Sequence, residues 1–473
     1  MEYFFNPKGI AVIGATPNIN KVGYSIIKNL LMGYRGLIYP VNPGYTEIEG
    51  LSCYPSVLNV PDPVDLAIIF VPAPKVPNLV RQCAKRGIKG VMIQSAGFAE
   101  VGREGEALQE EIVCVARETG IRIWGPNCMG IVDVVHKHVF SFVSPTIWEE
   151  GMLEGKVSLI VQSGLLSAGF LIDLMSHTTT GISKACSIGN KADVDECDLL
   201  EYLMKDPLTT AIGLYIESIC DGPRFFSLCK ASEKPVVVLK GGKSEKGAEA
   251  AMSHTASMAG NFDIIRGAFK QVGIVEASDF HEMAEIAKAL AMYPHVNQNA
   301  GGRIAIITFS GAAGIVSTDL MTRRGLRLAE LSAETLESLK VVYPEWMPPT
   351  NPIDLWPAIE RSGSQRAYGE SVKAVCRDPG VDAILMHLFV GGVVSRQLDL
   401  AYIAEMARKA HKPLFLCALG RREELRRFNT KAHEVGVPTF REIGRAIEGI
   451  AAVLSTSSSK RRGKYKNKRQ QFS

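Results

Sequence analysis

A histidine surrounded by small residues is the first feature of this sequence that could carry chemistry. His254 lies within Ser253-His254-Thr255-Ala256-Ser257-Met258-Ala259-Gly260, so a substrate can approach its ring closely and the segment can move. Neutral imidazole has a pKa near neutrality and a free lone pair on one ring nitrogen, which makes it a nucleophile. A lone histidine more often has only a structural role, and the small neighbours are what favour a catalytic one here.

Glu217 could hold such a histidine in the required tautomer. It ends a predicted strand at residues 213–217, and a carboxylate there can accept the proton of the ring nitrogen that does not react. The alternative interpretation is a solvated acid at the end of a strand.

The start of a predicted helix could bind a phosphate. Ser163, Gly164 and Leu165 follow a strand and open a helix, where free N–H groups and the helix dipole attract an anion. A nucleophilic serine at Ser163 is the alternative, but Gly-x-Ser-x-Gly is absent there.

Two smaller features admit both a functional and a structural interpretation. Gly189 and Asn190, in the loop at 187–193, could join a ligand site or form an ordinary Gly-Asn turn. His136 and His138 form a His-x-His pair, but no acidic or thiol partner stands at obvious ligand spacing. We therefore expect no metal site there.

The N-terminal segment alternates short apolar strands with helices. Such strands predict a parallel sheet covered on both faces, in a doubly wound, Rossmann-like arrangement. A nicotinamide cofactor is not expected, because Gly-x-Gly-x-x-Gly is absent and the second strand ends in Pro40-Val41-Asn42-Pro43 without an acid. The predicted strands lie at 9–14, 37–41, 65–71, 90–93 and 122–124, with a helix at 21–32.

The loops after these strands could form a ligand cleft, since ligands of open parallel sheets bind outside the carboxyl ends of the strands. The loop after Gly14 opens a helix and could cradle a phosphate through its N–H groups, with Thr16 and Lys21 adding a hydroxyl and a positive charge. An ordinary strand-to-helix turn is equally compatible with this loop.

Two later segments open alike. Each is a strand ending in Ser-Gly, at Ser163 and Ser310, followed by a helix that reaches Asp-Leu-Met, which predicts two related flavodoxin-like domains. The fold class is therefore α/β. We expect a Rossmann-like domain at 1–130, a linker at 131–155, flavodoxin-like domains at 156–295 and 301–455, and a disordered basic tail at 456–473.

Composition excludes several classes of protein. The 473 residues are 46% hydrophobic, yet no apolar run is long enough to span a membrane. The 10 cysteines are scattered without Cys-x-x-Cys, which favours a reducing cytoplasm over a disulfide framework or a zinc site. Residues 460–469 hold seven Lys or Arg; without them the formal charge of +4 becomes −3, so nucleic acid is an unlikely partner of the globular part.

The N-terminal motifs VIGAT, PVNP, FVPA, SAGFAE and GPNCMGI resemble the coenzyme A-binding domain of succinyl-CoA synthetase alpha subunits. They are closer still to the ADP-forming acetate–CoA ligases. The resemblance implies that these loops hold coenzyme A and lead its thiol toward the active site. The implied contacts are Gly14, Ala15, Thr16, Lys21, Val41, Pro72, Ser95, Glu100, Asn127 and Cys128.

The later motifs carry the same resemblance. The segment around His254 resembles the phosphohistidine loop of NDP-forming synthetases, with Ala256 where Gly is common. This implies that His254 is phosphorylated, that Glu217 orients it, and that the transferring phosphate contacts Ser163, Gly164, Leu165, Gly189 and Asn190. The motif Asn351-Pro352-Ile353-Asp354-Leu355 matches the family's Asn-Pro-x-Asp-Leu, and we assign its domain to assembly and to framing the active site.

The resemblance implies an alpha subunit that interconverts acyl-CoA, phosphate and ADP with carboxylate, coenzyme A and ATP. Neither a P-loop nor an ATP-grasp module is evident, so Mg²⁺ and the nucleotide are expected on a separate ATP-grasp beta subunit, in an alpha2beta2 assembly. The alternative is a non-catalytic regulator that senses coenzyme A or acyl-CoA on the same scaffold. It is disfavoured because a sensor needs neither His254 nor Glu217.

Overall fold

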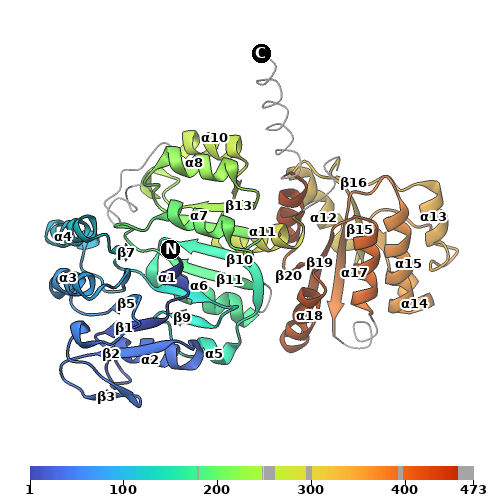
Figure 1. Ribbon diagram of the computed structural model, residues 1–473. Helices are drawn as coiled ribbons and strands as arrows, with labels where there is room; N and C mark the ends of the chain where they lie inside the picture. The colour runs from blue at the N-terminus through green and yellow to red at the C-terminus, as the bar shows by residue number, and fades with distance from the viewer. Residues whose placement is uncertain (178–179, 248, 250–261, 295–300, 392–397, 456–473) are drawn as a thin grey trace. The chain divides into compact units, whose positions relative to one another are not determined.

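The structure is a computed structural model of the chain, and it describes all residues except 178–179, 248, 250–261, 295–300, 392–397 and 456–473. The chain divides into two compact units. Figure 1 colours the chain from blue at the N-terminus to red at the C-terminus. The first unit contains Met1–Ser176 and Gly181–Met283, and the second contains His177–Thr180 and Ala284–Ser473. Each unit has a hydrophobic core of its own.

The first sheet has five parallel strands in the order β2-β1-β5-β6-β7. They are β1 (Gly9–Ile13), β2 (Leu37–Val41), β5 (Leu66–Ile69), β6 (Gly90–Ile93) and β7 (Arg122–Trp124), and all five lie where the sequence predicted strands. The helices are α1 (Glu2–Phe5), α2 (Val22–Gly33), α3 (Val76–Arg86) and α4 (Arg103–Thr119). Short elements are β3 (Glu47–Ile48), β4 (Leu51–Ser52), η1 (Val57–Asn59), η2 (Ala73–Lys75) and η3 (Ala99–Val101).

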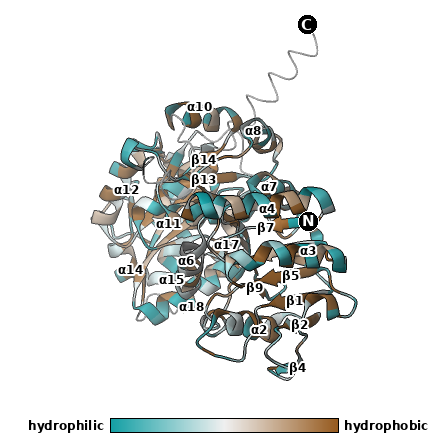
Figure 2. Cartoon of the chain, turned by 90° about the vertical axis from the view of Figure 1, so that its left-hand side faces the viewer, coloured by the Kyte–Doolittle hydropathy of each residue, from teal (hydrophilic) through white to brown (hydrophobic). Residues whose placement is uncertain are grey.

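The strands of this sheet are apolar because helices cover both of its faces. Residues of α3 and α4 pack on one face, and residues of α1 and α2 pack on the other. Helix α3 has Pro77 in its first turn and ends before Gly87, whose φ of 85° supplies the left-handed residue that closes the helix. Figure 2 shows the hydrophobic colouring concentrated on strands such as β1 and β5.

The second sheet of the first unit has seven strands in the order β14-β13-β12-β10-β11-β8-β9. They are β8 (Gly130–Asp133), β9 (His138–Phe140), β10 (Glu154–Val161), β11 (Ile182–Ser187), β12 (Ala211–Ile216), β13 (Val236–Lys240) and β14 (Val275–Glu276). Its helices are α6 (Gly164–His177), α7 (Glu196–Lys205), α8 (Gly222–Ala231) and α10 (Phe262–Val272). Helix α11 (Phe280–Met292) begins in the first unit, and its residues from Ala284 onward belong to the second. One core cluster runs from the first sheet into this one, so the two sheets form a single compact unit.

The segment at 131–155 is not the plain linker that the sequence suggested. It contains most of β8, all of β9 and helix α5 (Ile147–Glu150), and β8 pairs antiparallel with β11. Ile131 and Val132 are buried by this pairing, which explains their apolar character. The domain limits proposed from the sequence otherwise stay a prediction.

The second unit contains a six-stranded sheet in the order β16-β15-β18-β19-β20, with β17 paired to β15. The strands are β15 (Arg303–Thr308), β16 (Arg327–Leu328), β17 (Ile353–Asp354), β18 (Ala383–Val390), β19 (Leu414–Gly420) and β20 (Thr439–Phe440). The helices are α12 (Gly311–Arg323), α13 (Ala333–Leu339), α14 (Trp356–Ser362), α15 (Ser364–Arg377), α17 (Leu400–Lys409) and α18 (Arg422–Glu434). All pairings in this sheet are parallel. Among the described residues, no helix has the length and apolar character needed to cross a membrane.

Candidate active site

The carboxyl ends of three parallel strands meet at one edge of the seven-stranded sheet. Val161, the last residue of β10, is in register with Ser187 of β11 and with Tyr215 of β12. The residues that follow the three strands therefore emerge side by side. This is the edge at which open parallel sheets bind their ligands.

Gln162 joins two of these strand ends. Its side chain is 6% exposed, and its Oε1 accepts hydrogen bonds from the backbone N–H groups of Glu217 (2.7 Å) and Ser218 (3.2 Å). A buried amide oxygen that satisfies two backbone donors holds the chain in one direction as it leaves β12. Gln162 was not among the residues predicted from the sequence; its signal was a polar side chain directly before a Ser-Gly helix start.

Glu217 is half-buried, with its carboxylate next to Tyr215. The Tyr215 hydroxyl donates a hydrogen bond to Oε1 of Glu217 at 3.1 Å. Burial raises the pKa of Tyr215, and the charge of Glu217 raises it further, so the phenol stays protonated and acts as the donor. The structure thus fixes Glu217 at its backbone through Gln162 and at its carboxylate through Tyr215.

Two lysines bring positive charge to the same strand ends. Lys240 donates from Nζ to the backbone oxygen of Glu217 at 2.6 Å. Burial lowers the pKa of Lys240, and the nearby positive charge of Lys191 lowers it further, while Glu217 opposes the shift. Lys191, which has a φ of 56°, pairs with the buried carboxylate of Glu196 at 2.9 Å and donates to the backbone oxygen of Ser218 at 2.9 Å. None of these lysine contacts was predicted from the sequence.

The N-terminus of α6 lies against the loop that leaves β7. A Cβ on Gly164 would stand 3.5 Å from the backbone oxygen of Asn127. Ser187 accepts the N–H of Met129 at 2.9 Å, and its hydroxyl lies 3.5 Å from the backbone oxygen of Ser163. The helix start predicted to bind phosphate therefore adjoins a loop predicted to bind coenzyme A. Leu165 follows in the first turn of α6.

Gly189 allows a second close approach to the same loop. Its φ is 56°, and a Cβ there would collide with the backbone oxygens of Pro126 and Asn127, so only glycine fits. The N–H of Asn190 donates to Pro126 at 2.9 Å, and the N–H of Ala192 donates to Gly125 at 2.9 Å. The turn is therefore a docking point between the two sheets of the first unit.

Asn190, predicted to contact phosphate, has its side chain turned toward residues of the first sheet. Its Nδ2 donates to Glu100 at 2.6 Å and to Gln109 at 3.0 Å, and its Oδ1 accepts from Asn127 at 3.3 Å. Burial alone would raise the pKa of Glu100, but the bonds from Asn190 and from the N–H groups of Gly97 and Phe98 hold it below its usual value. The structure thus brings together Glu100, Asn127 and Asn190.

The loop after β1 is packed tightly against the start of α2. Gly14 has a φ of 97°, and a Cβ on it would collide with the backbone oxygen of Phe70. Ala15 and Thr16 are buried, whereas Lys21 is exposed at the helix start. The Asn42 amide donates to the backbone oxygen of Ala15 at 2.8 Å.

The remaining predicted contacts lie at the ends of the other strands. Pro72 is exposed, while Val41, Ser95 and Cys128 are buried. Ser95 accepts the N–H of Val71 at 3.0 Å. Burial raises the pKa of the Cys128 thiol to about 12, and its Sγ donates to the backbone oxygen of Ile93 at 3.4 Å. Cys128 is therefore held as a neutral packing residue in this loop.

Two family models match the chain: a CoA binding domain over residues 8–133 and a succinyl-CoA ligase-like flavodoxin domain over residues 154–290. ADP-forming acetate–CoA ligase II of Archaeoglobus fulgidus is 37% identical over 97% of this chain and 67% of its own length. The alpha subunit of ADP-forming acetate–CoA ligase I of Pyrococcus furiosus is 37% identical over 98% of this chain and 100% of its own. The chain belongs to the ADP-forming acetate–CoA ligase family. Members of this family are acid–thiol ligases.

A solved structure of the same family has the same fold. Acetyl-coenzyme A synthetase 1 of Ca. Korarchaeum cryptofilum, in complex with phosphate and ADP, is 33% identical, covers 97% of both chains and has a TM-score of 0.83. The chain spans about two thirds of Archaeoglobus acetate–CoA ligases II and I, 67% and 65% of their lengths.

His254, which the sequence analysis predicted to be phosphorylated, lies outside the described residues, as do its neighbours at 250–261. Strand β13, which precedes this segment, ends at Lys240, whose Nζ donates to the backbone oxygen of Glu217. Farther along, Lys243 pairs with Glu276 at 2.6 Å.

The His-x-His pair has protein partners. His136 Nδ1 lies 2.8 Å from Asp133 Oδ2, and His138 Nδ1 lies 3.0 Å from the backbone oxygen of Phe5. Within the part of the chain that the structure describes, no three His, Cys, Asp or Glu residues gather as a metal site would require.

The family's Asn-Pro-x-Asp-Leu motif has a structural role in the second unit. The Asn351 amide accepts the N–H of Ile306 at 3.0 Å and donates to the backbone oxygens of Ile304 (3.0 Å) and Ala329 (2.9 Å). One side chain therefore continues the sheet hydrogen bonding beside β15. Ile353 and Asp354 form β17, in which Asp354 pairs with Thr308 at the end of β15.

Proposed function

We propose that this chain supplies the coenzyme A-binding and phosphoryl-relay part of an ADP-forming acyl-CoA synthetase. The reaction interconverts acyl-CoA, phosphate and ADP with carboxylate, coenzyme A and ATP. The observation that carries the proposal is the close approach of two regions. The α6 start at Gly164 and the turn at Gly189 both lie against the loop at Asn127.

This approach suits the first step. A thioester held by the loops of the first sheet would present its carbonyl carbon to a phosphate at the start of α6. A phosphate oxygen attacks the carbonyl carbon, the C–S bond breaks, and coenzyme A leaves as a thiol with the proton from phosphate. The helix dipole favours the anionic phosphate, and Lys240 adds a positive charge at a neighbouring strand end.

The second step transfers the phosphoryl group to His254. A ring nitrogen attacks phosphorus, the P–O bond to the acyl group breaks, and the carboxylate is released. The phosphorylated ring is positively charged, so a carboxylate that accepts its remaining N–H stabilises it. Glu217 is our candidate, since Gln162 and Tyr215 hold it in one position.

The third step passes the phosphoryl group to ADP, and we propose that Mg²⁺ and ADP are bound by an ATP-grasp subunit in an alpha2beta2 assembly in the cytoplasm. The lengths of the relatives support a nucleotide site outside the region that this chain covers. The Pyrococcus protein matched over its full length is named an alpha subunit, whereas the Archaeoglobus ligases extend well beyond the matched region. Phosphoryl transfer from a nucleotide depends on positioning and on neutralising charge with metal and cations.

A labelling experiment tests the proposal. The chain, together with its ATP-grasp partner, is incubated with γ-labelled ATP and Mg²⁺. We expect acid-labile, alkali-stable phosphate on this chain, and none on the His254→Ala variant. The chain alone should bind coenzyme A in calorimetry but take up no label. Label that persists in His254→Ala would overturn the phosphohistidine assignment, and a chain that binds no coenzyme A would overturn the assignment of the first sheet.

A further inference from the structure

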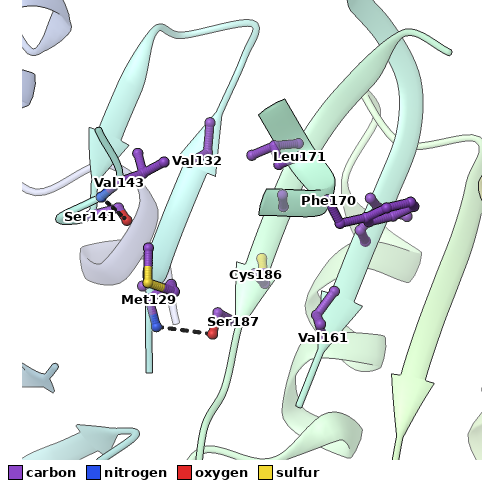
Figure 3. A pocket seen from close by; sticks show the side chains of 12 residues that line it. Met129, Val132, Ser141, Val143, Val161, Phe170, Leu171, Cys186 and Ser187 are labelled. Atoms are coloured by element: carbon purple, nitrogen blue, oxygen red, sulfur yellow. Dashed lines mark hydrogen bonds between the residues drawn. The ribbon is translucent and has the colours of Figure 1, made fainter. Parts of the chain in front are cut away.

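The segment after β11 lies along the edge of the first sheet. Ser187, the last residue of β11, accepts the N–H of Met129 at 2.9 Å, a bond drawn beside a small apolar cavity in Figure 3. Farther along, N–H groups at every second residue donate to backbone oxygens around β7, each at 2.9 Å: Asn190 to Pro126, Ala192 to Gly125 and Val194 to Ile123. Such alternate bonds hold the segment in one register against the first sheet.

Asn190 reaches from this segment to the loop predicted to bind coenzyme A. Its two amide protons go to Glu100 at 2.6 Å and to Gln109 at 3.0 Å. The other oxygen of Glu100 accepts the N–H groups of Gly97 (2.6 Å) and Phe98 (3.2 Å). The Glu100 carboxylate therefore shapes its own loop, and Asn190 anchors that carboxylate to the segment after β11.

Lys191 reaches in the other direction, to the loop that follows β12. Its Nζ lies 2.9 Å from the buried carboxylate of Glu196 and donates to the backbone oxygen of Ser218 at 2.9 Å. The second oxygen of Glu196 accepts the N–H of Cys220 at 2.8 Å. The ion pair thus holds this loop at two points just beyond Glu217.

Backbone conformation lets the two neighbouring side chains reach opposite sheets. Gly189 and Lys191 both have a φ of 56°, which is uncommon for a lysine and persists only where its surroundings hold it. The buried pair with Glu196 does so here. The three donors of the Lys191 ammonium and the two of the Asn190 amide all bond to the protein, so these donors serve the fold around the site.

We infer that Asn190 and Lys191 are positioning residues for two different parts of the reaction, and the inference rests on the proposed function. Asn190 holds the coenzyme A loop through Glu100. Lys191 holds the chain just beyond Glu217, which would orient His254. Two adjacent residues should therefore have separate kinetic effects.

Lys191→Met tests the second role in the assembled enzyme. We expect phosphorylation by γ-labelled ATP, measured by rapid quench, to slow about 10-fold because Glu217 is less well placed. The Kd of coenzyme A, measured by calorimetry, should change by less than about twofold. Lys191→Met leaves a buried carboxylate without a cation, which can prevent folding. In that case Lys191→Met with Glu196→Gln replaces it, since Gln keeps an oxygen for the Cys220 N–H, and the same slowing is expected.

Lys184→Met is the matched control. The side chains of Lys184 and Lys191 are both 2% exposed, and Lys184 pairs with Asp206 at 2.8 Å. Glu196 begins α7 and Asp206 follows its last residue, so the two ion pairs lie at opposite ends of one helix. Lys184→Met should lose stability but keep the phosphorylation rate within about twofold. Lys184→Met with Asp206→Asn is the control for the double variant.

Asn190→Ala tests the first role. It removes the donor that anchors Glu100, so we expect the KM for coenzyme A in thioester formation from acetate and ATP to rise about 10-fold. Phosphorylation, a step without coenzyme A, should stay within about twofold of wild type. Gln109→Ala is the control, because it removes the other partner of Asn190 and leaves the bond to Glu100 in place. Its KM should be close to that of wild type.

The outcomes separate the positioning roles from the proposed function. Asn190 and Lys191 variants that change both quantities together would overturn the positioning roles alone. So would a Lys184→Met enzyme that is phosphorylated as slowly as Lys191→Met. A wild-type assembly that takes up no label would overturn the proposed function, and the positioning roles with it.

Discussion

In the seven-stranded sheet, Gln162 and Glu217 follow β10 and β12, whereas Phe309 and Phe389 stand at the corresponding positions of the six-stranded sheet. The correspondence comes from register, since Ile160 pairs with Leu214 and Ile307 pairs with Met386. In the first case, an amide oxygen accepts the Glu217 N–H at 2.7 Å. In the second, two aromatic rings lie 6.3 Å apart.

The next strand differs in the same way. Lys240 ends β13 and donates to Glu217, but Ala418 stands at the corresponding place in β19, followed by Leu419. Phe389 is 48% exposed and Leu419 is 53% exposed. The seven-stranded sheet therefore presents polar and charged groups at its strand ends. The six-stranded sheet presents apolar side chains there, of the kind that contacts with another protein cover.

The two helix starts differ in charge. Gly164 opens α6 beside the backbone oxygen of Asn127, whereas a Cβ on Gly311, which opens α12, would stand 3.0 Å from the Asp354 carboxylate. A carboxylate at a helix N-terminus already complements the dipole and repels a second anion. The comparison teaches that a shared Ser-Gly start does not specify chemistry; the residues on the neighbouring strand ends do.

Glu217→Gln is the substitution from which we expect the largest effect. A Gln side chain still forms a hydrogen bond, but it cannot stabilise a positively charged imidazole. We expect phosphorylation of the assembled enzyme to slow by at least about 100-fold, with coenzyme A binding unchanged. The matched variant is Phe389→Leu, which should change the rate by less than about twofold. Equal effects of the two substitutions, measured by rapid-quench labelling, would show that Glu217 is only a strand-end acid.

Gln162→Leu should have the next largest effect. It leaves the N–H groups of Glu217 and Ser218 without their acceptor, which should cost about 3 kcal/mol of unfolding free energy. We also expect about a tenfold loss of kcat, because Glu217 would be less well placed. Phe309→Leu, at the same position of the other sheet, should cost less than about 1.5 kcal/mol. Denaturant unfolding measures the loss of stability, and steady-state kinetics measure the loss of kcat. A Gln162→Leu enzyme as active as wild type would show that Gln162 does not position Glu217.

The sequence was sufficient for the elements but not for the contacts between them. The five strands of the first sheet and the two Ser-Gly helix starts follow from apolar runs and turn residues. The strands β8 and β9 were missed because they pair antiparallel, β8 with β11 and β9 with β8, whereas the alternation of strands and helices in the sequence predicts only parallel neighbours. Asn190 and Glu100 are 90 residues apart, and their hydrogen bond depends on how two loops meet, which no local pattern encodes. The role of His254 stays a prediction.

A smaller effect should appear in the pH dependence of the second unit. His387 stands where Tyr215 stands in the first unit, with its ring between Thr308 (3.2 Å) and Ser317 (3.1 Å). Burial lowers its pKa to about 4. Below pH 6.5 the unfolded chain takes up a proton that the folded unit does not, so stability is lost as pH falls until about pH 4. The loss should be about 2 kcal/mol between pH 6.5 and 5.

His387→Gln should flatten this dependence, because Gln does not titrate. Calorimetric unfolding at pH 7 and pH 5 measures the difference. His411→Gln is the control, since His411 is exposed in the same unit, and it should unfold like wild type at both pH values. A His387→Gln variant that loses as much stability on acidification as wild type would show that another group controls it.

The smallest effect is expected from removing residues 457–473. This segment lies outside the described residues, and its seven cations at 460–469 come without an acid, a composition that cannot bury surface. If the chemistry belongs to the strand ends of the second sheet, turnover and subunit assembly should stay within about twofold of the full chain. The alternative is a polybasic arm that attracts an anionic surface or nucleic acid, whose effect would grow as salt is lowered. Turnover and light scattering at low and high salt distinguish the two, and a large loss of either at physiological salt would show that the tail takes part in catalysis or assembly.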